Sequence, residues 1–148
     1  MDMYFERSLA VLLVALSWTI VGCGEAGGER AEVRGKVTFE GVPVESGSIA
    51  FAPIEGTKGP SVGGAIKGGE YHIRRGEGPV SGPHRVMILG TRQTGRKVRE
   101  GEGGEDFNAL VDEVEMFIPR KYNVESSLTV EIEAGTNELN FDLEGGGK

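Results

Sequence analysis

The sequence predicts an all-β domain, an antiparallel sandwich or small barrel of about seven strands. Short runs after residue 32 alternate apolar and polar residues with the period of two that is typical of half-buried strands. Turns rich in Gly, Pro and Asn separate these runs at regular intervals. Glycine supplies 25 of the 148 residues, against about 7% in an average protein, and glycine destabilises helix interiors.

The alternating runs follow one another from residue 33 to residue 143. The expected strands span residues 33–39, 49–53, 65–67, 71–73, 84–88, 128–132 and 139–143. Gly68-Gly69 is expected to close a two-residue hairpin, because a type I′ turn needs a positive φ at both central positions. Residues 134–137 are expected to join the last two strands as another hairpin. The predicted core contains Val37, Phe39, Phe51, Val86, Val130 and Phe141, with His84 facing inward and His72 outward.

One segment interrupts the strand pattern. Residues 92–105 are charged, glycine-rich and not periodic, so they predict a long mobile loop. Asp106 is expected to cap a short helix after it, because apolar residues recur at i, i+3, i+4 and i+7: Phe107, Leu110, Val111 and Val114. Loops on a rigid sandwich often carry recognition, which makes these residues partner-binding candidates: Arg96, Lys97, Arg99, Arg120, Lys121 and Tyr122. The alternative is a solvated loop that Ile118 and Tyr122 merely pin to the sheet.

The amino-terminal segment has a different composition. Residues 9–21 are uncharged and shorter than the ~20 residues that a membrane-spanning helix needs. Their length suits the apolar region of a secretory signal peptide, and small residues follow them at Gly22-Cys23-Gly24. A buried core helix or a short membrane anchor is the alternative interpretation.

Ile20-Val21-Gly22-Cys23 resembles a bacterial lipobox. The resemblance implies that residues 1–22 are a lipoprotein signal peptide and that Cys23 is the lipid attachment site. Residues 23–32, polar and glycine-rich, would then be a flexible tether. The protein would be anchored in the cell membrane or outer membrane and face the periplasm or the exterior. The sequence departs from the lipobox pattern in carrying Ile20 in place of the commoner leucine, and its first residues lack the usual positive excess.

The rest of the chain resembles planctomycete-type small lipoproteins with a transthyretin-like or carboxypeptidase-regulatory-like domain. The matching motifs are Val33-Arg-Gly35-Lys-Val37-Thr-Phe39, Gly41-Val-Pro43-Val44, Ile49-Ala-Phe51-Ala-Pro53, Gly82-Pro-His84-Arg-Val86-Met-Ile88, Ile118-Pro119-Arg-Lys121-Tyr122 and Leu128 to Leu143. The resemblance implies an Ig-like, transthyretin-like sandwich over residues 33–144, followed by a disordered tail at 145–148. The central hairpin lacks the Asp that this family often has. The family has no general catalytic site to carry over.

Several kinds of chemistry have no signature in the sequence. A net charge of -7 argues against nucleic-acid binding, and the single cysteine excludes an intrachain disulfide. The histidines lack the spacing of a metal motif, and no serine lies in a nucleophile elbow. We therefore expect no cofactor and no catalytic activity. The leading hypothesis is a lipid-anchored envelope module that binds an unknown envelope protein or polymer; a structural envelope protein and a hydrolase are the alternatives.

The lipid anchor gives a first prediction. Cys23→Ala should abolish lipid attachment, because only the thiol can carry the thioether, and the protein should lose its membrane association. Fractionation and the mass of the mature chain measure this, with Ser46→Ala as the control. Unchanged processing and membrane binding in the Cys23 variant would contradict the lipoprotein assignment.

Overall fold

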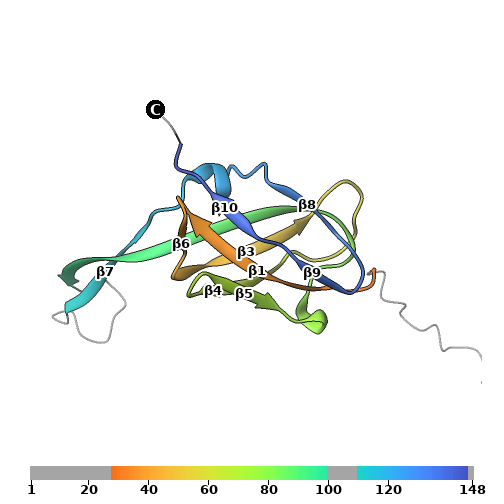
Figure 1. Ribbon diagram of the computed structural model, residues 1–148, viewed down its shortest axis with the longest axis horizontal. Coiled ribbons are helices and arrows are strands. Elements are labelled where there is room, and N and C mark those ends of the chain that lie inside the picture. Colours follow the sequence, from red (N-terminus) through yellow and green to blue (C-terminus); the bar gives the residue numbers. More distant parts are fainter. Residues whose placement is uncertain (1–27, 100–109, 147–148) are drawn as a thin grey trace, which may run out of the picture.

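Strands dominate the residues that the computed structural model describes, 28–99 and 110–146 (Figure 1). They are β1 (Glu32–Phe39), β2 (Val42–Pro43), β3 (Ser46–Pro53), β4 (Val62–Lys67), β5 (Glu70–Ile73), β6 (Gly82–Arg99), β7 (Leu110–Met116), β8 (Thr129–Ile132), β9 (Thr136–Glu138) and β10 (Phe141–Leu143), with 3-10 helices η1 (Arg75–Glu77) and η2 (Arg120–Tyr122). The all-β class is therefore confirmed. β2, β7 and β9 are additional to the strands that the alternation predicts.

The strands form one sheet that folds over on itself. Its order is β10–β1–β5–β4–β3–β6–β7, with β2 and β9 also on β1 and β8 also on β6. Pairing is mostly antiparallel, but β9 and β10 run parallel to β1. Residues 133–135 connect β8, near one end of this order, to β9 at the other end, and Figure 1 shows β1 and β10 crossing over β3 and β6. The inward faces of the two layers share one core, consistent with a sandwich.

The core comes from the inward side of the alternating runs. Buried apolar residues include Val33, Val37, Ile49, Phe51, Ile66, Tyr71, Ile73, Val86, Ile88, Ile132, Phe141 and Leu143. Two residues of the predicted core, Phe39 and Val130, are only half-buried and pack at its margin. The Tyr71 ring lies between those of Phe51 and Phe141, with centroid separations of 6.2 and 6.3 Å. The three rings come from β3, β5 and β10, so their contacts connect strands that are far apart in the sequence.

Two local predictions are confirmed. Gly68 and Gly69 have φ angles of 57° and 79°, and Lys67 pairs with Glu70 across them, so the two-residue hairpin forms. His84 is fully buried; its Nδ1 lies 3.0 Å from the Gly82 carbonyl oxygen, whereas its Nε2 has no hydrogen-bond partner among the described residues.

The loop and helix expected between residues 92 and 114 are wrong where the structure describes them. Residues 92–99 continue β6, and Leu110–Met116 forms β7 antiparallel to them. An isolated helix of about ten residues is marginal in water, whereas every residue of β7 except Glu113 has a cross-strand partner on β6. Residues 100–109, including the expected helix cap Asp106, lie outside the described residues.

The second expected hairpin is also wrong. β8 pairs with β6, whereas β9 and β10 pair with β1, so residues 133–135 form a crossover between layers. Asn137 holds it: its Nδ2 donates to the Glu133 carbonyl oxygen at 2.8 Å, and its Oδ1 accepts from the Glu133 N–H at 2.9 Å. Nδ2 also lies 3.4 Å from the Glu32 carbonyl oxygen on β1. The side chain thus ties the crossover to the strand that receives it.

The folded domain begins before residue 33. Ala31 is fully buried, and its N–H donates to the Pro79 carbonyl oxygen at 2.8 Å. Arg30 pairs with Val80. Residues 30–32 therefore belong to the domain and not to the tether expected over 23–32. The expected signal peptide and Cys23 lie outside the described residues, as do residues 147–148 of the tail.

The shared core gives a stability prediction. Phe141→Ala should lower the free energy of unfolding by about 3–5 kcal/mol, because it removes a buried ring and leaves a cavity. Val42→Ala is the control, because Val42 is 64% exposed and its truncation should change the unfolding free energy by less than about 0.5 kcal/mol. Urea denaturation followed by circular dichroism measures both. Equal effects of the two changes would show that Phe141 is not a core residue.

Candidate functional site: the β6–β7 arm

The second half of β6 and all of β7 form an arm that projects from the sandwich. β3 pairs with β6 only as far as Thr91, which lies opposite Ser46. Further along, residues 92–99 pair with β7 and with no other strand in the part of the chain that the structure describes. Figure 1 shows this two-stranded ribbon extending beyond the layers. We call residues 91–99 together with β7 the arm.

Cross-strand ion pairs cover the arm. Arg92 Nε lies 2.7 Å from Glu115 Oε1, and Lys97 Nζ lies 2.8 Å from Asp112 Oδ1. Arg96 donates to Glu113 through Nε at 2.8 Å and through Nη2 at 2.9 Å. Exposed pairs contribute little individually, but together they favour one register of β7 on β6.

A β-bulge concentrates donors on Glu113. The β6–β7 register shifts between Gln93 and Lys97, and Gly95 takes a φ of 79° there. The shift places Thr94 Oγ1 2.6 Å from Glu113 Oε2. The hydrogen bond from Thr94, together with the hydrogen bonds and charge of Arg96, lowers the pKa of the Glu113 carboxyl below its usual value.

The arm also exposes apolar side chains. Leu110, Val114 and Met116 alternate along β7 and are 62%, 57% and 73% exposed. None of the described arm residues belongs to the core cluster. These three side chains thus lie outside the core and are each more than half exposed to solvent. Exposed apolar groups next to polar ones are typical of contact surfaces.

The two strands of the arm carry opposite charges. The β6 portion contains only cations among its charged residues: Arg92, Arg96, Lys97 and Arg99. β7 contains only acids: Asp112, Glu113 and Glu115. The arm thus carries both positive and negative charges, as the composition indicates, but the positive charges lie on β6 and the negative charges on β7.

The predicted partner-binding residues fall into two separate groups. Arg96, Lys97 and Arg99 lie on the arm, whereas Arg120, Lys121 and Tyr122 form η2. Figure 1 places η2 beside β10, away from the end of the arm. The structure therefore does not bring the two groups together into one site.

The contacts of η2 support the alternative in which this region pins the connection to the sheet. The Tyr122 hydroxyl accepts from the Glu144 N–H at 3.0 Å, and its ring packs against the core. Ile118 is buried in the core. Arg120 Nε lies 2.8 Å from Glu125 Oε1, and Lys121 Nζ lies 4.9 Å from the Tyr122 ring centroid. Only the two cations of η2 remain well exposed.

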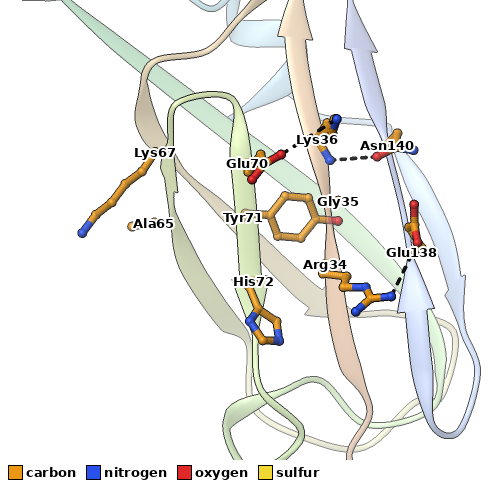
Figure 2. A pocket seen from close by; sticks show the side chains of 10 residues that line it. All are labelled: Arg34, Gly35, Lys36, Ala65, Lys67, Glu70, Tyr71, His72, Glu138 and Asn140. Atoms are coloured by element: carbon orange, nitrogen blue, oxygen red, sulfur yellow. Dashed lines mark hydrogen bonds and ion pairs between the residues drawn. The ribbon is translucent and has the colours of Figure 1, made fainter.

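A polar hollow beside β1, β4 and β5 was not expected from the sequence. Its volume is about 780 Å³, and it is lined by Arg34, Gly35, Lys36, Ala65, Lys67, Glu70, Tyr71, His72, Glu138 and Asn140. Figure 2 shows Arg34 extending toward Glu138 and Lys36 toward Glu70. Both ion pairs span 3.8 Å. These lining residues become neighbours only through strand register, so local sequence gives no signal for them.

Tyr71 and Gly35 form the floor of this hollow. They lie opposite each other on β5 and β1, and a Cβ on Gly35 would lie 1.8 Å from the Leu139 carbonyl oxygen. The Tyr71 hydroxyl donates to that same oxygen at 2.8 Å, and burial raises the pKa of Tyr71 above its usual range. The hydroxyl thus stays protonated and serves the packing of β9 and β10 on β1. The hollow offers a ligand mainly cations that neighbouring acids already neutralise.

Residues 28–99 and 110–146 contain no group of three or more His, Cys, Asp or Glu side chains placed to hold a metal ion. In the same residues, no helix is long and apolar enough to cross a membrane. Comparison with protein-family models, curated protein sequences and solved structures found no match for the chain.

The Glu113 cluster gives a pH prediction. Because its pKa is lowered in the folded arm, Glu113 stabilises the arm above the usual carboxyl pKa, about 4.3, and this contribution is lost as the pH falls through the lowered value. Thr94→Val removes the hydroxyl donor, so the pKa of Glu113 should rise toward the usual value and the arm should open at a higher pH. Carboxyl carbon NMR titration and hydrogen exchange of arm amides measure this. An unchanged Glu113 midpoint, with Thr129→Val as the control, would rule out the Thr94 contribution.

Proposed function

We propose that this protein is a non-catalytic binding module that is anchored to the cell envelope through lipid on Cys23 and uses the arm to contact an envelope protein or polymer. The arm is the observation that carries the proposal. Its described residues add nothing to the core, yet they present apolar side chains, charges and strand edges to solvent. These are the chemical groups with which proteins recognise partners.

The placement of the chain ends supports this proposal. The described chain enters the sandwich at the start of β1, at the opposite end of the molecule from the arm (Figure 1). A lipid on Cys23 would hold the protein by that entry side. The arm would then point away from the point of attachment, where a partner can reach it. The transthyretin-like assignment of the sandwich is part of the same proposal, and it rests on the motif resemblance and the all-β architecture.

The groups of the arm suit binding better than bond-breaking chemistry. Its carboxylates are engaged by cations, as in the pair of Lys97 with Asp112 and the cluster around Glu113. The lowered pKa of Glu113 makes it a poor proton donor near neutral pH, and general acid–base catalysis requires a group whose pKa lies near the working pH. The same pairs keep the arm in one conformation, which lowers the entropy lost on binding.

An arm-shortened variant tests the proposed function. Arg92 lies opposite Glu115 and points its backbone N–H and C=O toward β7, as Gly90 does, so Asn-Gly in place of residues 93–114 should close a two-residue hairpin between them without disturbing the sandwich. Crosslinking in the native envelope should then lose the partners captured by the parent protein, whereas the unfolding free energy of the sandwich stays nearly constant. Arg120→Ala with Lys121→Ala is the control and should retain those partners. Identical partners in the parent and the arm-shortened variant would overturn the proposal.

A further inference from the structure

The arm has one strand edge that no described residue covers. β3 ends its pairing with β6 at Thr91, so on that side residues 92–99 have no neighbouring strand in the described chain. β7 occupies only the other side of β6. An open edge presents unpaired N–H and C=O groups that can accept a further strand. We call this side of residues 92–99 the open edge.

Backbone hydrogen bonds show which residues face the open edge. The Gly90 carbonyl oxygen accepts from the Phe117 N–H at 3.1 Å, and the Val86 N–H donates to the Leu128 carbonyl oxygen at 2.8 Å. Even-numbered residues of this stretch therefore point their backbone groups toward β8 and β7. Odd-numbered residues point toward β3, because the Pro83 carbonyl oxygen accepts from the Ile54 N–H at 3.0 Å. Gln93 continues this series, so its N–H and C=O face the open edge.

The residues of β7 show which kind of strand pairs well with this part of β6. It carries three acids among four apolar residues, and each of its acids pairs with a cation of β6. Side chains stand above and below a sheet, so the same cations can be reached from both sides of β6. The open edge therefore offers a second acidic strand the backbone groups and the positive charge that β7 uses on the first.

We propose that the open edge binds an extended acidic segment of a partner protein by strand addition. This inference rests on the proposed function and specifies its partner. Charge argues against a second copy of the chain as the occupant, because antiparallel pairing of two open edges would place the cations of both copies side by side. An acidic strand instead faces the exposed sides of these cations, which number four against the three acids of β7.

Peptides provide the direct test. The probe is a synthetic peptide with the sequence of β7, Leu110–Met116, between short Gly-Ser flanks, added to the full-length protein in detergent micelles. We expect saturable binding that weakens with salt and NMR shift changes concentrated in residues 92–99. A second peptide carries Asp112→Lys, Glu113→Lys and Glu115→Lys and should bind at least tenfold more weakly. A third has alternate residues replaced by proline and should not bind.

A protein variant separates edge pairing from simple charge attraction. Gln93→Pro removes an N–H of the open edge while leaving the β7 side of β6 intact, and proline suits an extended edge strand. It should weaken binding of the acidic peptide at least tenfold, whereas the control Gln93→Thr should bind like the parent. Unchanged arm signals in both variants verify that β6 and β7 remain paired.

Each result decides the inference. Equal binding of the acidic and basic peptides, or equal binding by the two Gln93 variants, overturns it. Self-association of the protein that Gln93→Pro abolishes would identify a second copy as the occupant and also overturn it. Should the acidic peptide fail to bind while the arm-shortened variant still loses its crosslinked partners, the proposed function stands and this inference falls. Should the arm-shortened variant keep its partners, the proposed function falls separately.

Discussion

The absence of a side chain at Gly90 allows β6 to be both a core strand and an arm. Position 90 faces the interior, in line with Val86 and Ile88. A Cβ there would lie 2.6 Å from Ile118 Cγ1 and 3.1 Å from the Phe117 ring. Ile118 uses this space, and the Phe117 N–H binds the Gly90 carbonyl oxygen. The chain returning from β7 is thus fixed to β6 at the point where the arm leaves the sandwich.

The two sides of that point are stabilised by different interactions. Before Gly90, inward residues of β6 are buried against the other layer, and removal of apolar surface from water supplies most of the stability. After it, the arm residues are exposed and ordered by ion pairs and backbone pairing with β7. Salt and low pH act on the second kind of interaction far more than on the first. Such a division lets the arm respond to its surroundings while the sandwich stays folded.

Local patterns in the sequence identified the parts of the fold that local interactions determine. The Gly68-Gly69 turn and the inward position of His84 depend on neighbouring residues, and both are correct. The first half of β7 was predicted as part of a helix because apolar residues recur at i, i+3, i+4 and i+7 from Phe107 to Val114. The spacing of four between Leu110 and Val114 puts both residues on one face in a helix and in a strand alike. What selects the strand is β6, which is distant in sequence for most of β7. The crossover after β8 likewise depends on the contact of Asn137 with β1.

The candidate site also depends on contacts between residues that are distant in the sequence, which local patterns do not show. Composition alone shows cations over residues 92–99 and acids near residue 113, which suggests a solvated loop of mixed charge. Only the register of β7 on β6 separates the charges into a basic and an acidic strand. For Tyr122 the sequence is misleading in another way. Its basic neighbours suggest an exposed residue, but its ring packs against the core.

Charge also explains how an open edge can persist without pairing with a second copy of the chain. A flat apolar edge would tend to pair with identical edges of other copies. Here Arg92, Arg96, Lys97 and Arg99 line the edge, so two such edges repel each other, and the bulge at Gly95 distorts the ladder that a second copy would have to match. The repulsion acts only between like strands. The features that oppose self-association therefore leave pairing with an acidic strand favourable, and one set of side chains provides both solubility and selectivity.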